Sequence, residues 1–351
     1  MLGVLLLAFI PAAAFFVTGL YLQPLDGDLT RIGAHAERDY GWNAPQTVFN
    51  QPLYTNESYT KHHDVVVVGD SFATAMPAHQ WQNHLVAATG LSVATLSSYN
   101  TSIEQVLQSP VFLSRPPRYL VLTYAERHFP SQLNKDSACD SNPTATPAVH
   151  ARPVPASISV PTIETPRVLR RQTQWADWRD VKLGYAAKHV IYGVARKVFD
   201  HEPTKTLRVG LTRDDLFSNA TPSMTLVFRG DTEKTAQWRN PGLPDLSCKI
   251  ENLRRKVEAN GHTRFILMVP PDKLTAYSPW ARSAELQSLS ALDALSELHT
   301  AVMPRIDRAL IEVIGSGHKD VYLPNNTHWG STGHLVAAQA LIDFLALSKQ
   351  P

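Results

Sequence analysis

The feature that most constrains the fold is a short apolar run, residues 64–68 (DVVVV), which ends in Gly69, Asp70 and Ser71. A β-branched run of this length, bounded by a turn signal, is typical of a strand buried on both faces of a parallel sheet. The serine then lies on a turn between this strand and a helix, at the carboxyl end of the sheet. Open α/β folds bind ligands at that edge, so Ser71 is the first candidate functional residue.

Further segments repeat the alternation of strand and helix, which favours a parallel sheet with right-handed crossovers and hence an α/β fold. In the first half, we expect a helix over 72–90, a strand over 91–96, a short helix over 103–107 and a strand over 118–124. In the second half, we expect a helix over 247–260, a strand over 264–269, a long helical region over 280–314, a short strand over 320–323 and a helix over 332–347.

The alternation is interrupted over residues 132–245, which we interpret as an insertion into the core. Residues 142–167 are rich in proline, which removes backbone donors and restricts the preceding residue. This stretch is therefore expected to be an excursion, a lid or a partner-binding loop. The regular elements expected in the insertion are a helix over 168–199 and strands over 207–211 and 226–229.

The N-terminal segment Leu2–Leu22 contains no charged side chain. A hydrocarbon core of about 30 Å requires about 20 such residues, so a transmembrane anchor is the preferred interpretation. A cleaved signal peptide would lack its usual basic start, and a buried core helix is the third alternative. A polar juxtamembrane stretch follows over 23–60, and the core comprises 61–131 and 246–351.

The side of the membrane on which the domain lies is inferred from charge and cysteine content. No Lys or Arg precedes Arg31, so the positive-inside rule sets no orientation. The first charges after the span are Asp26 and Asp28, and the chain has only two cysteines, which together favour an outward-facing domain. Cys139 and Cys248 are either a disulfide, as an oxidising compartment would allow, or two buried thiols.

Composition excludes several classes of protein. The formal net charge of +2 gives no reason to expect nucleic-acid binding. The two cysteines lack metal-type spacing, and the adjacent His62 and His63 on an extended chain point to opposite sides. No phosphate-binding glycine loop or dinucleotide fingerprint is present. We therefore expect neither a metal nor a cofactor.

A histidine that can serve Ser71 lies late in the chain. His328 follows the expected strand over 320–323 and precedes a helix, so it too is expected at the carboxyl edge of the sheet. Ser71 would act as nucleophile and His328 as its general base. The backbone N–H of Ser71 would be one oxyanion donor. The alternatives are an N-capping serine and an ordinary loop histidine.

The third member of such a triad is not an acid at the usual position. Asn326 stands two residues before His328, and its amide oxygen can hold an imidazole without supplying charge. We rank Asn326 first as the group that orients His328. Asp320 comes second, and a bare Ser–His dyad third.

Two further loops are expected at the same edge. The loop after the second strand carries Tyr99, Asn100 and Ser102, whose side chains could complete an oxyanion hole or bind substrate. After the third strand come Glu126 and Arg127, either a structural ion pair or part of an acceptor site. Asp70 is included among the residues at the site, although shaping its own turn is its expected role.

These motifs together resemble the SGNH-hydrolase-like family, in particular its alginate-type polysaccharide O-acetyltransferase branch. Two departures are clear: the branch usually has Asp where Asn326 stands, and it commonly places the His motif before the Ser motif. The matching segments are Gly69-Asp70-Ser71-Phe72, Ser98-Tyr99 to Gln105-Val106-Leu107, Glu126-Arg127, Val269-Pro270-Pro271-Asp272-Lys273 to Tyr277, and Thr327-His328-Trp329 through Gly333.

The resemblance implies a flavodoxin-like three-layer fold and a ping-pong mechanism through acyl-Ser71, with Trp329 among the substrate-site residues. It also implies a periplasmic or cell-surface location, here a bacterial inner-membrane anchor with an extracytoplasmic domain. The implied partners are a membrane-bound O-acyltransferase that supplies the acyl group and a polysaccharide acceptor. The leading hypothesis is thus polysaccharide O-acetylation. The alternatives are an esterase or deacetylase of the same fold, and a catalytically idle glycan-binding or scaffold subunit.

Overall fold

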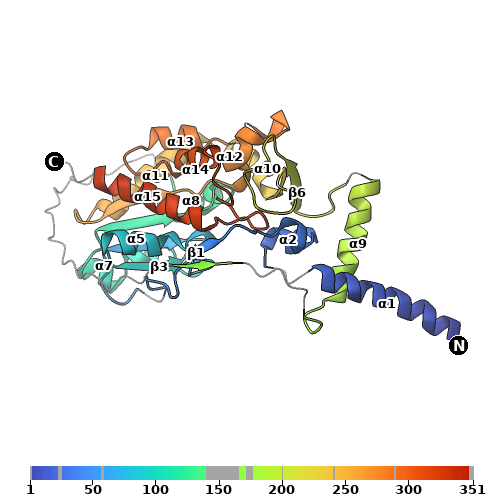
Figure 1. Cartoon of the computed structure of the whole chain (residues 1–351). Helices are drawn as coiled ribbons and strands as arrows, with labels where there is room; N and C mark the ends of the chain where they lie inside the picture. Colours follow the sequence, from blue (N-terminus) through green and yellow to red (C-terminus); the bar gives the residue numbers. More distant parts are fainter. Residues whose placement is uncertain are drawn as a thin grey trace.

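A computed structural model describes residues 2–22, 26–56, 59–139, 166–170, 177–199, 201–239, 242–287 and 290–347, without the side chains of 2–8 and 347 (Figure 1). Its centre is a parallel sheet in the order β3-β2-β4-β8. This confirms the α/β fold class. The strands are β2 (Val65–Gly69), β3 (Val93–Ser97), β4 (Tyr119–Thr123) and β8 (Arg264–Met268).

The register brings the carboxyl ends of these strands to one edge. Gly69 pairs with Ser97 on one side and with Thr123 on the other, and Thr123 pairs with Met268. Glycine is required at position 69, because a Cβ there would collide with Thr123 and Ala73. Numbered by their order along the chain, the four strands lie in the order 2-1-3-4, which is typical of doubly wound sheets. In such sheets the strand order reverses next to the first strand, and ligands bind at the carboxyl ends of the strands there.

Alternate residues of β2 face two different hydrophobic clusters. Val65 and Val67 pack toward α5 (Trp81–Thr89), α14 (Ile306–Gly315) and α15 (Ser331–Leu347). Val66 and Val68 pack toward the opposite layer. The helices of that layer are α6 (Ile103–Leu107), α7 (Pro110–Ser114), α8 (Phe129–Asp136), α11 (Leu243–Glu258) and α13 (Leu292–Leu298). The sheet therefore has helices on both faces, an arrangement compatible with a three-layer fold.

Two expected helices are interrupted where the chain turns. The helix expected over 72–90 is divided into α4 (Ser71–Thr74) and α5, because Met76 adopts a positive φ of 49° and Pro77 follows it. The region 280–314 contains short 3₁₀ turns, α13 and α14 instead of one helix, with Pro304 just before α14. The 3₁₀ turns are η1 (Ser278–Trp280) and η2 (Ala284–Leu286).

Three further boundaries are corrected. The helix expected over 247–260 begins earlier, at Leu243 in α11. Residues 320–323 form no strand; a single bridge joins Tyr322 to Trp329. Within 168–199, the described residues form β5 (Arg167–Leu169) and α9 (Leu183–Val198).

The N-terminal residues and the insertion add smaller elements around the core. They are α1 (Leu2–Leu22), α2 (Asp28–Gly33), α3 (Glu37–Tyr40), β1 (Gln46–Val48), which pairs antiparallel with β5, the hairpin of β6 (Thr206–Gly210) and β7 (Met224–Phe228), and α10 (Gly230–Arg239). The short helix α12 (Lys273–Tyr277) follows β8 and belongs to the core. A search of the described residues finds no helix long and apolar enough to span a membrane. Nearly all of the proline-rich stretch lies outside the described residues.

The two cysteines form a disulfide, which decides between the two alternatives. Cys139 follows α8 and Cys248 lies in α11, with their Cα atoms 5.5 Å apart. The bond ties the segment that follows α8 to α11, in the same layer, across a sequence separation of 109 residues.

Replacing both Cys139 and Cys248 by serine is expected to lower the free energy of unfolding by about 2–4 kcal/mol, because the unfolded chain gains freedom over a long loop. Urea denaturation of the double variant and the wild type measures the difference. Wild-type protein unfolded in a thiol reductant serves as the control and should match the variant. An unchanged midpoint in both would contradict a stabilising role for this bond.

Candidate active site

The turn that carries Ser71 is fixed by the neighbouring Asp70. One carboxylate oxygen of Asp70 accepts from the backbone N–H of Phe72 at 3.0 Å, and the other accepts from Ala125 N–H at 2.7 Å. Asp70 is buried, and burial raises the pKa of its carboxyl while the two backbone donors oppose the rise. Its side chain thus joins the start of α4 to the end of β4 and has a positioning role.

Ser71 itself is half-buried at the first position of α4. The next three N–H groups of the turn are occupied: Phe72 donates to the Asp70 side chain, and Ala73 and Thr74 donate to the Asp70 carbonyl. Among the described residues, no acceptor faces the N–H of Ser71. That N–H is available to an incoming oxygen.

His328 is oriented by Asn326, the residue ranked first for this role. Asn326 Oδ1 lies 2.7 Å from His328 Nδ1 and also accepts from the backbone N–H of His328 at 3.1 Å. Because an amide oxygen only accepts, Nδ1 carries the imidazole proton and Nε2 carries the lone pair. The buried Nε2 has no hydrogen-bond partner in the part of the chain that the structure describes.

The histidine and serine loops meet through Phe72. The Phe72 ring lies 5.1 Å from the His328 imidazole and 4.9 Å from the Trp329 indole, measured between centroids. Ser71 directly precedes Phe72, so the nucleophile candidate and the base candidate lie on adjoining segments of the same edge.

An acid near His328 comes from a part of the chain that the sequence did not indicate. Asp28 Oδ2 lies 3.9 Å from His328 Nδ1. The same carboxylate accepts from Thr327 N–H at 2.9 Å and from Thr327 Oγ1 at 2.5 Å. Asp28 therefore both positions the histidine loop and supplies negative charge beside the imidazole.

Close backbone packing holds Asp28 in this place. Leu29 N–H donates to the Asn325 carbonyl at 3.1 Å, and a Cβ on Gly27 would collide with that same carbonyl oxygen. Glu37, which is buried, accepts from the Asn325 side chain. The described residues of the expected juxtamembrane stretch are thus packed onto the histidine loop.

Lys273 binds backbone carbonyls of the loop that carries His328. Its buried ammonium donates to the carbonyls of Leu323 and Pro324, both at 2.9 Å, and lies 3.4 Å from the Asn326 carbonyl. Burial lowers the pKa of Lys273 to about 7, although Asp28 and other carboxylates oppose the shift. This contact fixes the turn on which Asn326 lies.

Asp320, the second-ranked orienting residue, has other partners. Its buried carboxylate accepts from Ser218 N–H at 2.9 Å and from the Ser218 hydroxyl. The expectation that Asp320 could orient His328 is therefore corrected. Asp320 binds Ser218 in the loop before β7 instead.

The loop after β3 contributes residues of different kinds. Tyr99 is 68% exposed, and its pKa is raised by partial burial and then by the nearby charge of Asp70. Asn100 is also exposed. Ser102 caps α6, accepting from Gln105 N–H at 3.2 Å, so its side chain is occupied in a capping box. Tyr99 and Asn100 stay candidates for substrate contact.

Glu126 and Arg127 do not pair with each other, which corrects the ion pair considered for them. Arg127 binds Asp272 at 2.7 Å and lies 3.6 Å from Asp231. Glu126 pairs with Lys234 at 3.0 Å. All five of these side chains are buried, so they form a charged cluster behind the carboxyl edge of the sheet. The Arg127 guanidinium is paired with carboxylates inside this cluster.

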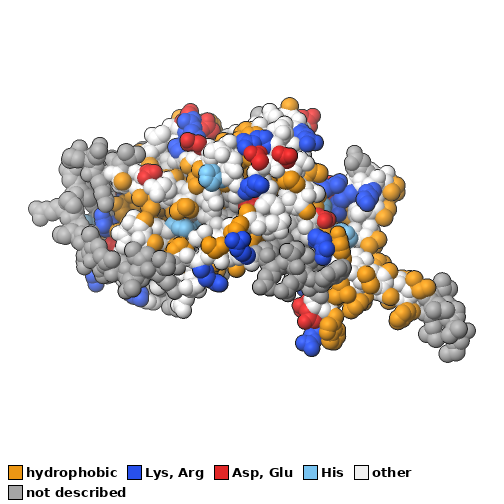
Figure 2. Space-filling model, in the orientation of Figure 1, with side chains coloured by type: hydrophobic (Ala, Val, Ile, Leu, Met, Phe, Trp, Pro, Cys, Tyr) orange, Lys and Arg blue, Asp and Glu red, His pale blue; other side chains and the backbone are white. Residues whose placement is uncertain are grey.

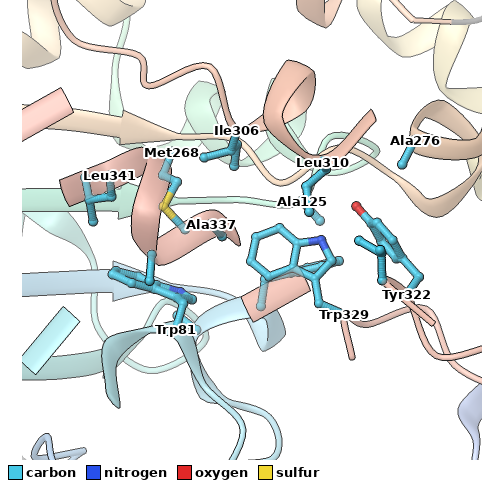
Figure 3. Packing of buried hydrophobic residues seen from close by; sticks show 14 of the residues in the cluster. Trp81, Ala125, Met268, Ala276, Ile306, Leu310, Tyr322, Trp329, Ala337 and Leu341 are labelled. Atoms are coloured by element: carbon cyan, nitrogen blue, oxygen red, sulfur yellow. The ribbon is translucent and has the colours of Figure 1, made fainter. Parts of the chain in front are cut away.

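The expectation that Trp329 is a substrate-site residue is also corrected. Trp329 is buried in the core, with its ring centroid 4.9 Å from that of Phe72 and 6.3 Å from that of Tyr322. Figure 3 shows Trp329 beside Tyr322 among the buried hydrophobic residues. Its indole therefore supports the site from the interior and does not face a substrate.

The electrostatics of the site favour a neutral base. Burial lowers the pKa of His328; Asp28 opposes this shift and Arg127 adds to it. A neutral imidazole with a free Nε2 can accept a proton at pH 7.

The described residues contain no group of three or more His, Cys, Asp or Glu side chains that could hold a metal ion. Comparison of the chain with family models, curated proteins and solved structures finds no match.

Proposed function

We propose that this protein is a membrane-attached, extracytoplasmic serine acyltransferase that O-acetylates a hydroxyl of a polysaccharide. The observation that carries the proposal is the state of His328. Its Nδ1 is held by Asn326, and its Nε2 is unpartnered beside the turn that presents Ser71. Other buried histidines, His334 among them, also have unpartnered ring nitrogens. What sets His328 apart is that its free nitrogen lies next to the turn that presents Ser71, while Asn326 holds the other nitrogen.

In the first half-reaction, Ser71 Oγ bonds to the acyl carbonyl carbon as its proton passes to His328 Nε2. The bond to the leaving oxygen then breaks, and the leaving group takes that proton. In the second half, a sugar hydroxyl attacks acyl-Ser71, gives its proton to Nε2, and Ser71 departs with the proton returned. The N–H of Ser71 stabilises the oxyanion in both halves.

Asn326 and Asp28 divide the role of the usual triad acid in this proposal. Asn326 fixes the tautomer of His328. In a serine protease whose triad Asp is replaced by Asn, the histidine takes the wrong tautomer and turnover falls sharply. Asp28 supplies the charge that stabilises the imidazolium. The sequence departs from the family pattern at Asn326, and Asp28 compensates for the missing charge.

The resemblance to the SGNH-like O-acetyltransferase branch supports the transferase assignment and a periplasmic location. In this proposal residues 2–22 attach the chain to the inner membrane. A membrane-bound O-acyltransferase delivers the acyl group, and a polysaccharide accepts it. Tyr99 and Asn100, which are exposed at the same edge, are the residues proposed to contact the acceptor.

The test is detection of the acyl-enzyme. Mixing the protein with a small acetyl ester and quenching in acid should give a mass increase of one acetyl group, localised to Ser71 by peptide mapping. The Ser98→Ala variant, a serine of the neighbouring loop, should acylate normally. Adding oligosaccharide should then yield acetylated sugar. Release of acetate alone would indicate an esterase, and the absence of any acyl-enzyme would favour a glycan-binding subunit.

The Asp28→Asn variant is expected to lose about tenfold in kcat/KM, the equivalent of one pKa unit. It should also move the acid limb of the pH profile. Because burial lowers the His328 pKa, the wild-type limb should lie below the usual histidine value; removing Asp28 destabilises the imidazolium and moves the limb lower still. The pH dependence of ester turnover measures both effects.

The matched control is Asp343→Asn, an exposed carboxylate on α15 that should leave the profile unchanged. A loss of activity with the acid limb in its original place would mean that Asp28 only supports the loop structure.

A further inference from the structure

Helix α9 presents an apolar face to solvent. Five of its side chains recur at spacings of seven, one, three and four residues, which places them on one side of the helix. We call them the α9 stripe: Leu183, Val190, Ile191, Val194 and Val198, between 40 and 66% exposed. An apolar face of this length, uncovered by the described part of its own chain, is typical of an interaction surface.

The orientation of α9 is fixed by its other face. The Tyr185 hydroxyl lies 2.8 and 2.7 Å from the carbonyl oxygens of Thr30 and His35, and Arg196 donates to the Gly33 carbonyl. His189 Nδ1 lies 2.9 Å from the Ala34 carbonyl. These polar contacts hold α9 to the N-terminal segment, so the α9 stripe necessarily points outward.

The α9 stripe adjoins a second apolar surface, on α1. The two helices contact each other, with Phe15 and Tyr185 in one small cluster. Both project from the α/β body at an angle to one another (Figure 1), and hydrophobic side chains gather over both (Figure 2). On α1, Phe9, Ile10 and Val17 are 60% exposed or more.

The charges on α9 distinguish between the possible occupants of this surface. The helix contains no acidic residue, and Lys188 and Lys197 lie on opposite sides of the α9 stripe. Lysines flanking an apolar face are typical of a helix that lies in a membrane interface, where their stems extend to lipid headgroups. In a twofold contact between α9 helices of two copies, the same lysines would find no carboxylate on the facing helix, since α9 has none.

We propose that α9 is an interfacial helix that places the α9 stripe at the headgroup–acyl boundary of an anionic bilayer. The α1 segment enters the same membrane beside it. The inference rests on the membrane attachment in the proposed function, but not on its chemistry. Two helices at an angle fix the orientation of the domain over the bilayer, which one flexible anchor would not do.

The test uses the full chain with one added cysteine carrying an environment-sensitive fluorophore; both native cysteines are in the disulfide, so the added thiol reacts alone. The test variant is Val194→Cys. The matched control is Leu335→Cys on α15, since both positions are 50% exposed. Val17→Cys on α1 reports membrane attachment separately. The protein is reconstituted into vesicles of equal parts phosphatidylcholine and phosphatidylglycerol, with or without bromine on the acyl chains.

The expected result is that brominated lipid quenches the label at 194 about twofold or more, as for a helix buried several ångströms into the interface, and leaves 335 unchanged. Adding Lys188→Glu and Lys197→Glu should weaken the quenching at 194. Quenching at 17 without quenching at 194 would overturn the inference while keeping the attachment. No quenching at either site would contradict both. A blue-shifted but unquenched label at 194 would show that a protein covers the α9 stripe instead. Ester turnover by each variant tests the proposed chemistry independently.

Discussion

Replacing Ser71 by alanine is expected to reduce kcat/KM for a small acetyl ester by about 10⁴-fold or more, as loss of a catalytic nucleophile does in serine hydrolases. The reason is that, among the residues that the structure describes, no other hydroxyl on this edge combines a free backbone N–H with a neighbouring unpartnered imidazole. Residual turnover would come from the oxyanion donor and substrate binding. Steady-state ester hydrolysis over a range of enzyme concentrations measures the loss.

His328→Ala is expected to cost about as much as Ser71→Ala, and the double variant little more than either, because nucleophile and base act as a unit. Ser98→Ala controls for a serine of the adjoining loop and should stay near wild-type activity. If the Ser71 and His328 losses multiplied in the double variant, the two residues would act independently, and the acyl-transfer proposal would fail.

Lys234→Met is expected to lower the free energy of unfolding by about 3–5 kcal/mol, the cost of removing one partner from a buried ion pair. Lys234 is fully buried, with Nζ 3.0 Å from Glu126 and 3.3 Å from Asp272. Arg127 already binds Asp272, so no second cation can replace the lysine beside Glu126. Urea denaturation at pH 7.5 measures the change.

Arg308→Met is the control, since Arg308 also pairs with a carboxylate, Glu297, but both side chains are 57% exposed. Surface pairs of this kind contribute at most about 1 kcal/mol. Similar losses for the two variants would contradict the special role of the buried cluster.

Within that cluster, burial and Asp272 raise the pKa of Asp231 to about 7. The folded protein therefore keeps a proton on Asp231 that the unfolded chain releases, and the free energy of unfolding falls as pH rises from about 4 through 7.

The strands of the sheet could be predicted because their signal is local. Runs such as 64–68 and 264–269 are short and mostly apolar, the first of them almost entirely valine, and the structure places strands there within one or two residues. The strand order then follows from the connections. The helices were less predictable: Pro77 and Pro304 were visible, yet the apolar period continues across both, and tertiary packing decided where each helix ends.

The candidate site divides in the same way. Asn326 was predicted from its spacing to His328, because a two-residue separation keeps an amide within reach of the ring. Asp28 could not be predicted from spacing, since 299 residues separate it from its partner Thr327. Its only sequence signal is the Gly27-Asp28 pair, and the need for glycine there is visible only beside the Asn325 carbonyl.

Glu126 and Arg127 illustrate why adjacency misleads. Neighbouring residues on a loop project in different directions, and here one pairs with Lys234 and the other with Asp272. Both partners lie more than 100 positions away along the chain. A charged dipeptide therefore indicates that charges are present at an edge, but not which charges pair.

The attachment of Asp28 to the histidine loop limits how far the chemistry can lie from whatever holds α1. Only six peptide steps separate Leu22 from Asp28, so even a fully extended chain spans about 20 Å there. Asp28 in turn touches Thr327, next to the general base candidate. With α1 held in a bilayer as proposed, the acyl group would be transferred within a few nanometres of the lipid surface. A long polymer would then have to present a stretch that lies close to the membrane for modification.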